Sequence, residues 1–453
     1  MLVGGSLFAG GAPAAVAANI AIHPMLKAKF VSAKQPPSQA TCELAFTAPC
    51  YQPPQFQAAY NELPLFDRGI TGKGQTIAIV DSFGSPTIES DLATFDAEFG
   101  LPAPPSFRII QPAGKVTFDP TNPADLSWAG ETTLDVEWAH SMAPGASILL
   151  VETPVSETEG VHGFPQIVKA ENYVVNHHLA QVISQSFGAT EGTFPSANSI
   201  YRLRSAYLNA FRHHVTVLAA TGDAGATDYS DTAGTLLFTH PSVDWPSSDP
   251  LVTAVGGTQL ALLPITGQRA APDQVWNDSY NYALQNAFTG SPGPSALATG
   301  GGKSAVFPRP AYQDAVASVT GDQRGVPDIS MSGACSGLVV VYQSTPGQPA
   351  GWYVVCGTSE ATPLFAGIVA LADQQAGRSL GLINPALYLM SAEHAPGLVD
   401  VTQGNNTVSF FQPGLVKVQG YQAGPGYDLA SGVGTVNAAL FVPELALAAG
   451  HGY

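Results

Sequence analysis

The chain alternates between short apolar runs and longer stretches in which apolar and polar residues recur at helical spacing. Residues 72–84 (GKGQTIAIVDSFG) contain an apolar run that ends at Asp81, and residues 146–152 (ASILLVE) contain a second run. Three further runs of the same kind fall at 180–188, 214–226 and 250–257. Runs of this length that carry few charges are typical of strands buried on both faces of a sheet.

Segments with helical spacing separate these runs, at 86–99, at 164–178 and around 197–213. Strands that alternate with helices predict an α/β fold with a mostly parallel central sheet flanked by helices on both faces. Small, glycine-rich turns follow the strands, and open α/β sheets place their active sites at these carboxyl ends. We expect one domain over residues 51–445, which includes a Gly/Pro-rich acidic stretch at 395–437.

The composition describes a globular protein with a large core, since 45% of the residues are hydrophobic and 11% are charged. The 34 Asp and Glu residues outnumber the 17 Lys and Arg residues, and the net charge is −17. This balance argues against a nucleic acid or an anionic membrane as a partner. Protonation of every carboxylate would leave only the 17 Lys and Arg and the 10 His as charges. Self-repulsion in acid would therefore be limited.

Residues 1–50 differ from the rest of the chain. The first twenty, MLVGGSLFAGGAPAAVAANI, resemble the apolar core and small-residue end of a secretory signal, although the first basic residue is Lys27. Pro13 and four glycines argue against a membrane span. A polar, Pro-rich extension follows. We therefore expect a secreted protein.

Four cysteines predict two disulfides in an oxidising compartment. Cys42 and Cys50 are close in sequence. Cys335 and Cys356 bracket two β runs around a Pro/Gly turn, and a hairpin there would place them opposite each other. The alternative is four free, buried thiols.

The segment VCGTSEATPLFAG, at 355–367, places Ser359 where an apolar β run ends and a small-residue helix begins. A serine hydroxyl is a weak nucleophile that needs an adjacent base. Subtilisin-like enzymes use an aspartate, a histidine and a serine, and Asp81 and Ser359 could supply two of these. The chain has no His-Gly-Thr-His segment to supply the histidine. The alternative for Ser359 is a helix cap without chemistry.

A pair of carboxyl groups offers another base. Glu131 and Asp135 are four residues apart in SWAGETTLDVEWAHSMAPGA, at 127–146, so on a helix they share one face. Two carboxyls this close do not both ionise readily. Below about pH 5 a carboxylate remains usable as a base, whereas a histidine is protonated. We expect Glu131 to accept the proton of Ser359, with Asp135 behind it; the alternative is a solvated helix face.

Several ordered motifs carry a resemblance to a known family over roughly residues 50–440. They are CYQPPQFQAAYN, GETTLDVEWAHSMAPGA, ISQSFG, AATGDAGA, VWND, GGGKSAVFPRPAYQ, RGVPDIS, GTSEATPLFAG and AGPGYDLASGVGTVN. The chain resembles the sedolisins, or serine-carboxyl peptidases, and among them the kumamolisin-like members. The resemblance implies a subtilisin-like fold, a triad of Ser359, Glu131 and Asp135, and a secreted peptidase that is active in acid.

The resemblance also assigns Asp223, in the glycine-flanked turn ATGDAGA, to the oxyanion. Only the protonated acid could donate a hydrogen bond to that oxygen. The alternative is an ordinary turn aspartate. Asp81 would support the Glu131 and Asp135 pair from behind, or would merely cap the end of its strand.

A single Ca²⁺ ion is implied near the C-terminus. Asp400 and Asp428 could supply carboxylates, and Val401, Gly424 and Gly426 could supply backbone carbonyls. With water, these oxygens suit Ca²⁺, which takes about 6–8 ligands. The alternative is two surface loops in which the glycines only permit tight turns.

The leading hypothesis is a monomeric peptidase that acts on proteins or peptides. Family members usually carry a long N-terminal prosegment, and we expect no full prosegment in residues 1–50. One alternative is a catalytically silent binding or surface protein of the same fold. Another is a neutral subtilisin-like hydrolase, which the absence of the histidine motif disfavours.

Overall fold

A mostly parallel sheet forms the centre of the computed structural model, which describes residues 23–24, 27–154, 163–231, 234–289 and 293–451. The strand order is β12-β11-β9-β7-β4-β6-β5, and β15 pairs with β11 beside this path. Every pairing is parallel except that of β12 with β11. The strands are β4 (Thr76–Ser82), β5 (Phe107–Ile110), β6 (Ser147–Thr153), β7 (Val182–Gln185), β9 (Thr216–Ala220), β11 (Thr253–Gln259), β12 (Gln274–Val275) and β15 (Ile329–Ser332). The signal-like segment lies outside the described residues.

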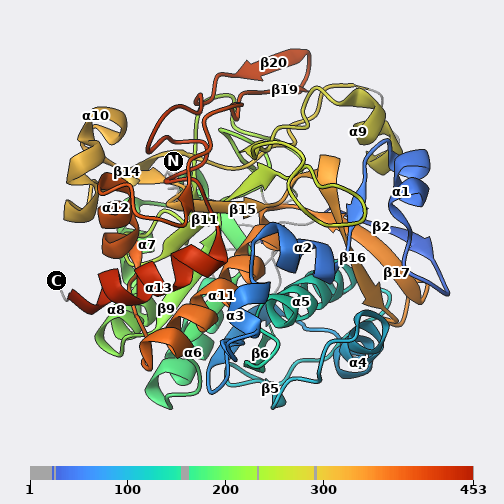
Figure 1. The fold of residues 1–453 in the computed structure, drawn as a ribbon. Helices are drawn as coiled ribbons and strands as arrows, with labels where there is room; N and C mark the ends of the chain where they lie inside the picture. Colours follow the sequence, from blue (N-terminus) through green and yellow to red (C-terminus); the bar gives the residue numbers. More distant parts are fainter. Residues whose placement is uncertain (1–22, 25–26, 155–162, 232–233, 290–292, 452–453) are drawn as a thin grey trace, which may run out of the picture.

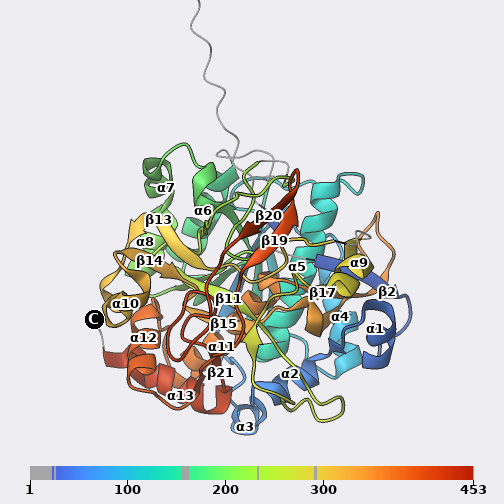
Figure 2. The same cartoon turned by 90° about the horizontal axis from the view of Figure 1, so that it is seen from above.

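Helices cover both faces of this sheet (Figure 1). One face carries α2 (Pro53–Ala59), α3 (Leu63–Phe66), α4 (Ile88–Phe99), α5 (Pro123–Met142), α11 (Thr358–Ala376) and α13 (Ala438–Ala448). The other face carries α6 (Gly163–Asn176), α7 (Ala197–Leu203) and α8 (Ser205–Arg212). Figure 2 shows α6, α7 and α8 on one side of the sheet and α2, α3, α11 and α13 on the opposite side.

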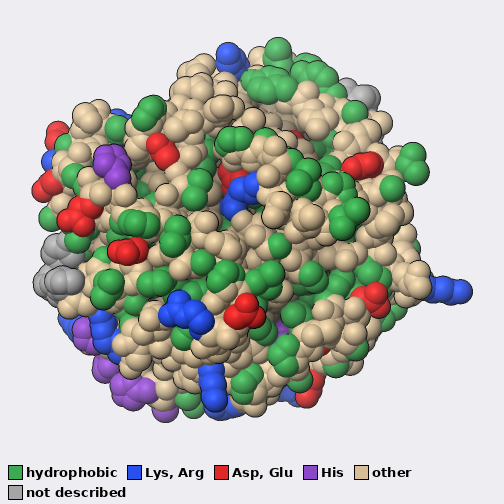
Figure 3. Space-filling model, viewed as in Figure 1, with side chains coloured by type: hydrophobic (Ala, Val, Ile, Leu, Met, Phe, Trp, Pro, Cys, Tyr) green, Lys and Arg blue, Asp and Glu red, His purple; other side chains and the backbone are tan. Residues whose placement is uncertain are grey.

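Alternate residues of β4 pack into two different hydrophobic cores, as a strand buried on both faces requires. Ile77 and Ile79 lie in the core beneath α5 and α11, whereas Ala78 and Val80 lie in the core beneath α6 and α8. The predicted α/β architecture, a mostly parallel sheet between two layers of helices, is confirmed. Acidic and basic side chains are few and scattered over the face in Figure 3, in keeping with the small charged fraction of the sequence.

A second sheet carries both disulfides. Its order is β2 (Lys27–Ser32), β17 (Gly351–Cys356), β16 (Leu338–Gln343) and β3 (Cys50–Tyr51). Strands β16 and β17 form the predicted antiparallel hairpin. One disulfide joins Cys335 to Cys356 with Cα atoms 4.9 Å apart, and the other joins Cys50 to Cys42 in α1 (Gln39–Phe46) across 5.7 Å. Both predicted disulfides are confirmed.

Two predicted elements differ from the structure. Residues 180–188 were expected as one strand, but β7 ends at Gln185, and β8 (Phe187–Thr190) instead pairs with β1 (His23–Pro24) and β10 (Asp244–Trp245). Ser186 lies at the break, fully buried. The helix expected around 197–213 is two helices, α7 and α8, which are separated at Arg204, where the guanidinium pairs with Asp249 across 2.6 Å.

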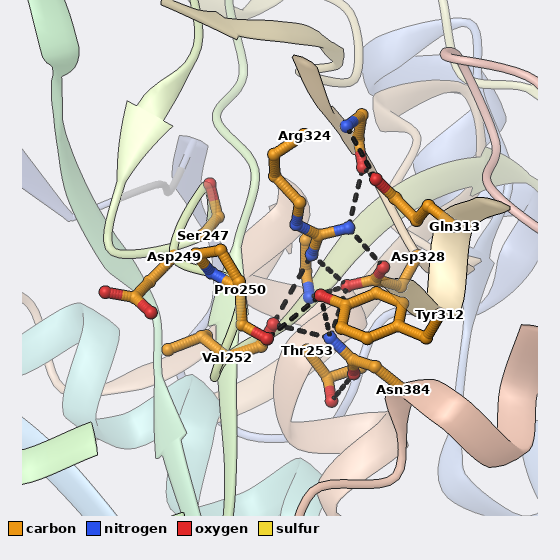
Figure 4. A network of polar contacts seen from close by, with 12 residues as sticks. Ser247, Asp249, Pro250, Val252, Thr253, Tyr312, Gln313, Arg324, Asp328 and Asn384 are labelled. Atoms are coloured by element: carbon orange, nitrogen blue, oxygen red, sulfur yellow. Dashed lines mark hydrogen bonds and ion pairs between the residues drawn. The ribbon is translucent and has the colours of Figure 1, made fainter. Parts of the chain in front are cut away.

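A buried polar network fixes the start of β15 (Figure 4). The guanidinium of Arg324 donates to both carboxylate oxygens of Asp328, and both side chains are fully buried. Asp328 also accepts from the backbone N–H of Ala254 in β11 at 2.8 Å and from the Tyr388 hydroxyl at 2.9 Å. A buried charge needs such partners. The network therefore sets where β15 meets β11.

The remaining elements surround these layers. They include α9 (Tyr282–Thr289), α10 (Ala317–Thr320), α12 (Asn384–Ala392), β13 (Gly302–Pro308), β14 (Gln323–Val326), β18 (Leu398–Val399), β19 (Val408–Phe411), β20 (Leu415–Val418) and β21 (Thr435–Val436). Among the described residues, no helix has both the length and the apolar character that a membrane crossing requires.

Candidate active site

Three elements bring four of the predicted side chains together. Ser359 is the second residue of α11, Glu131 and Asp135 project from α5, and Asp223 lies in the turn after β9. The first three are fully buried, and Asp223 is 9% exposed. Gly367 permits the close packing of α11 on α5, because a Cβ atom there would lie 2.4 Å from Cβ of Met142.

The nucleophile candidate faces the predicted base. Burial raises the pKa of Glu131 well above its ordinary value, and the nearby Asp135 carboxyl raises it further. The Ser359 hydroxyl lies beside Glu131 and offsets part of this rise. The same hydroxyl donates a long hydrogen bond, 3.4 Å, to the backbone carbonyl of Ser186. The hydroxyl group thus lies next to a proton acceptor, although neither Glu131 oxygen forms a hydrogen bond of good geometry with a described residue.

Asp135 is held by the residue at the break between β7 and β8. The Ser186 hydroxyl donates to Oδ1 of Asp135 at 2.8 Å. Burial raises the pKa of Asp135 well above its usual range, and the Asp81 carboxyl adds to the rise, whereas the bond from Ser186 lowers it. Because each carboxyl discourages ionisation of the other, the pair ionises in two separate steps, and in the singly ionised pair one carboxyl can accept a proton while the other keeps its own.

Asp81 lies at the end of β4, close enough to influence both members of the pair. Burial raises the pKa of Asp81 to about 7; the nearby Thr132 hydroxyl opposes the rise and the charge of Glu152 adds to it. The structure thus groups Asp81 with Glu131 and Asp135. Its supporting role stays a prediction.

The turn after β9 aims Asp223 at the first turn of α11. Oδ1 of Asp223 accepts from the backbone N–H of Thr358 at 2.8 Å and from its hydroxyl at 3.0 Å. The turn depends on Gly222, which has φ +102°, and a Cβ atom there would lie 2.6 Å from Asp228 and 2.8 Å from Asp244. The carboxyl of Asp223 is thereby fixed beside the residue that precedes Ser359.

His140 is the one histidine on α5, and it does not take part in this group. Its Nε2 atom lies 2.8 Å from the carbonyl oxygen of Pro102 and 3.4 Å from Asp96. Burial lowers the pKa of His140 to about 4. A buried imidazole with these partners packs the helix against its neighbours.

The five predicted calcium ligands lie on two neighbouring segments, 400–401 and 424–428. Asp400 accepts from the N–H of Gly426 at 2.8 Å, and Asp428 accepts from the N–H of Gly424 at 3.1 Å. The carbonyl of Val401 accepts from the Ser431 hydroxyl at 3.3 Å. A Cβ atom added to either glycine would meet nothing within 4 Å, so that side of the loop is open.

These residues fit Ca²⁺ in the chemistry of their donors, which are hard carboxylate and carbonyl oxygens. No group of three or more His, Cys, Asp or Glu side chains in the described parts of the chain could hold a metal ion. A cation at this loop would therefore depend on backbone carbonyls as much as on Asp400 and Asp428.

Comparison with known proteins shows the family. A model described as "Subtilase family" matches residues 114–406, which is more than half of the chain. The chain belongs to the subtilase family. It has the framework of a serine-type peptidase, and within the family it is a sedolisin-type, kumamolisin-like member.

Three named relatives illustrate this placement of the subtilase chain. Kumamolisin of Bacillus sp. (strain MN-32) is 33% identical over 395 residues, which are 85% of this chain and 62% of that protein. Sedolisin of Pseudomonas sp. (strain 101) is 29% identical over 419 residues, 92% and 64% of the two chains. Human tripeptidyl-peptidase 1 is 31% identical over 321 residues, which are 68% of this chain and 50% of that protein. The chain thus spans about half to two thirds of the length of these relatives.

A solved structure agrees with the subtilase framework. Pseudomonas sedolisin, a serine-carboxyl proteinase complexed with two molecules of pseudo-iodotyrostatin, superposes with a TM-score of 0.69 at 26% identity. The match covers 87% of this chain and 97% of that one. The likeness therefore extends over most of the chain, and it confirms the predicted subtilisin-like fold.

Sequence reasoning missed three neighbours of the subtilase site. Ser186 bonds to Asp135, Thr358 bonds to Asp223, and the buried acid Glu360 follows Ser359 directly. Ser186 lies within the quoted motif ISQSFG, and the other two lie within GTSEATPLFAG. The motifs contain these residues, but their partners belong to other elements, the helix α5 and the turn after β9, so the contacts could be found only in the fold.

Proposed function

We propose that this chain is an acid-active serine-carboxyl peptidase in which Ser359 is the nucleophile and Glu131 the general base. The observation that supports it is the position of the Ser359 hydroxyl beside the buried Glu131 carboxyl, with Asp135 behind. A carboxylate base keeps its function at a pH where a histidine would be protonated. The remote position of His140 agrees with this choice.

In the first step, Oγ of Ser359 attacks the carbonyl carbon of a peptide bond while its proton passes to Glu131. The carbonyl oxygen becomes an oxyanion, which accepts a hydrogen bond from protonated Asp223 near the N-terminus of α11. Collapse of this intermediate breaks the C–N bond, and Glu131 gives its proton to the leaving amine. The product at this stage is an acyl ester on Ser359.

In the second step, Glu131 takes a proton from water, and the hydroxide oxygen attacks the acyl carbon. Asp223 again donates to the oxyanion. Collapse breaks the ester bond, returns a proton through Glu131 to Ser359 and releases the carboxylic acid. Asp135, oriented by Ser186, stabilises the protonated state of Glu131 in both steps.

The two acids have opposite requirements, which confines the reaction to acid. Glu131 must be ionised to accept a proton, and Asp223 must be protonated to donate one. A rise in pH improves the base and disables the donor. An acidic optimum follows from these roles.

We also infer one calcium ion held by Asp400, Val401, Gly424, Gly426 and Asp428, where it would join the two chain segments that supply these oxygens. Protein or peptide substrates and secretion of a monomer belong to the same proposal. The two disulfides support an oxidising compartment.

The test is digestion of an unfolded protein at about pH 3–5, with the fragments identified by mass spectrometry. The matched control is a folded Ser359→Ala variant, prepared identically. Loss of a triad nucleophile costs on the order of 10⁶ in rate, so this variant should release no fragments. Equal cleavage by both proteins, or by neither, would contradict the proposal; inactivity of both would favour a catalytically silent protein of this fold.

A further inference from the structure

Glu360 directly follows the proposed nucleophile and is the third residue of α11. A glutamate at this position commonly reaches back to cap the helix. Here the cap residue is Gly357, no side chain caps the helix, and the Glu360 side chain is fully buried. Neither carboxyl oxygen has a hydrogen-bond partner of good geometry among the described residues. The acid is therefore turned into the protein next to the reacting group.

Within the described parts of the chain, the groups around this carboxyl offer no positive charge to balance its ionisation. The Ser332 hydroxyl, at the end of β15, lies beside it. The Tyr60 phenol lies near by and accepts from the N–H of Ser332 at 2.7 Å. The carboxyl of Asp223 faces it from the turn after β9. The titratable groups that face Glu360 are thus an uncharged phenol and another acid.

The cation that lies over the Tyr60 ring already has a partner. Arg269 lies over the Tyr60 ring, 4.9 Å from its centroid, and its Nε atom pairs with Asp273 across 2.7 Å. Burial raises the pKa of Glu360 well above its usual range, Asp223 raises it further, and only the Ser332 hydroxyl opposes the rise. An unpaired carboxylate in the interior is strongly disfavoured, so the structure holds this acid uncharged.

We propose that Glu360 is a positioning residue that works as an uncharged acid, and that its ionisation opposes oxyanion formation at the first turn of α11. The inference rests on the proposed function of Ser359. The N-terminus of a helix stabilises a developing negative charge. A carboxylate at residue three of that helix would cancel this potential, and it would also repel the charge on the substrate oxygen.

Ionisation of Glu360 and ionisation of Asp223 would then both lower the activity as the pH rises. Two acids that face each other titrate as a coupled pair, so the loss of activity belongs to both. Removal of Glu360 would leave Asp223 as the acid that sets the alkaline limit. That limit would move to higher pH because the N-terminus of α11 would keep its positive potential up to a higher pH.

The experiment measures kcat/KM for an uncharged peptide across the acidic and neutral range in wild type, Glu360→Gln and Glu360→Ala. Each profile is normalised to its own acidic optimum. We expect the alkaline limb of both variants to move up by about one pH unit, a roughly tenfold gain at a fixed pH on that limb. A purely structural role of Glu360 would change the height of the profile without moving the limb.

The matched control is Glu171→Gln. Glu171 is equally buried, both of its oxygens lack a hydrogen-bond partner among the described residues, and it lies in α6 on the opposite face of the sheet. Its limb should coincide with that of wild type. Thermal unfolding at each pH checks that every protein is folded. If Glu360→Gln does not fold, the comparison is made with Glu360→Ala.

Three results separate the possibilities. Limbs of the folded Glu360 variants that coincide with wild type overturn this inference alone. An equal shift in Glu171→Gln also overturns it, because the limb would then report global stability. Full activity in Ser359→Ala would instead overturn the proposed function on which the inference rests.

Discussion

Ser186 contacts both halves of the proposed catalytic group: its hydroxyl donates to Asp135 at 2.8 Å, and its carbonyl accepts from the Ser359 hydroxyl at 3.4 Å. The chain leaves the central sheet at this residue, so its backbone and side chain are both available to the site. The end of β7 thereby fixes the acid and the nucleophile relative to each other.

We expect Ser186→Ala to lower kcat roughly ten- to hundredfold. Removal of the donor leaves an oxygen of buried Asp135 unpaired, at a cost of about 1–3 kcal/mol, and raises its pKa further. The matched control is Ser184→Ala, because Ser184 is also fully buried and belongs to β7 itself. Equal losses in the two folded variants would assign the effect to packing.

Glu131→Gln and Asp135→Asn should each reduce activity severely, and Glu131→His should not restore it. Glutamine cannot accept the proton of Ser359, and a histidine would be charged in acid. His140→Ala should act through packing, visible as lower stability. An active Glu131→Gln variant, together with a folded but inactive His140→Ala variant, would require a histidine mechanism instead.

The pH profile of Asp223→Asn tests the proposed oxyanion donor. An amide donates at every pH, so activity should survive in part and the alkaline limb should move towards neutrality. Asp223→Ala should lose roughly 10²–10³ in turnover, which is the usual effect of one oxyanion donor. A limb of Asp223→Asn that coincides with wild type would return Asp223 to the role of a turn residue.

The sequence identified the main elements because their signals are local. The apolar run at β4, the hairpin of β16 and β17 and the helix that carries Glu131 each depend on periodicity or on a turn within the segment. The serine and its acids could be proposed because the motifs are contiguous. The break at Ser186 could not be foreseen, since residues 180–188 have uniform β character and β8 is set by distant partners in β1 and β10.

The calcium proposal concerns stability. A chelator should lower the melting temperature, because an ion that binds only the folded state stabilises it by mass action. The Asp400→Ala and Asp428→Ala variants should have lower melting temperatures, and added Ca²⁺ should not raise them. Substitution of the exposed Asp322 by alanine should leave the effect of Ca²⁺ on the melting temperature unchanged. An unchanged melting curve, with no calcium found by elemental analysis, would remove the ion from the proposal.

Stability should fall as the pH rises from acid to neutral. Burial raises the pKa of Glu62 and Glu171 well above their ordinary values and that of Asp373 to about 8. Above about pH 4.3, the unfolded chain loses these protons while the folded chain keeps them, so each group removes up to about 1.4 kcal/mol per pH unit. His140, with its pKa lowered to about 4, acts in the opposite sense, losing stability as the pH falls.

Denaturant titrations at several pH values would measure this slope. Glu62→Gln and Glu171→Gln should each flatten it, because an amide has no proton to lose. The exposed Asp322, replaced by asparagine, is the control and should leave the slope unchanged. A free energy of unfolding that increases steadily towards neutral pH would contradict the assignment of uncharged interior acids.

Every residue of α11 from Thr358 to Asp373 is buried, and Ser359 lies in its first turn. Amide hydrogens in so enclosed a helix should exchange with solvent only when the whole core opens. A molecule that has opened far enough to be cut within α11 by its neighbours has therefore already separated Ser359 from Glu131. Self-digestion would then remove molecules that are no longer competent, and a stored preparation would lose protein without losing activity per intact chain.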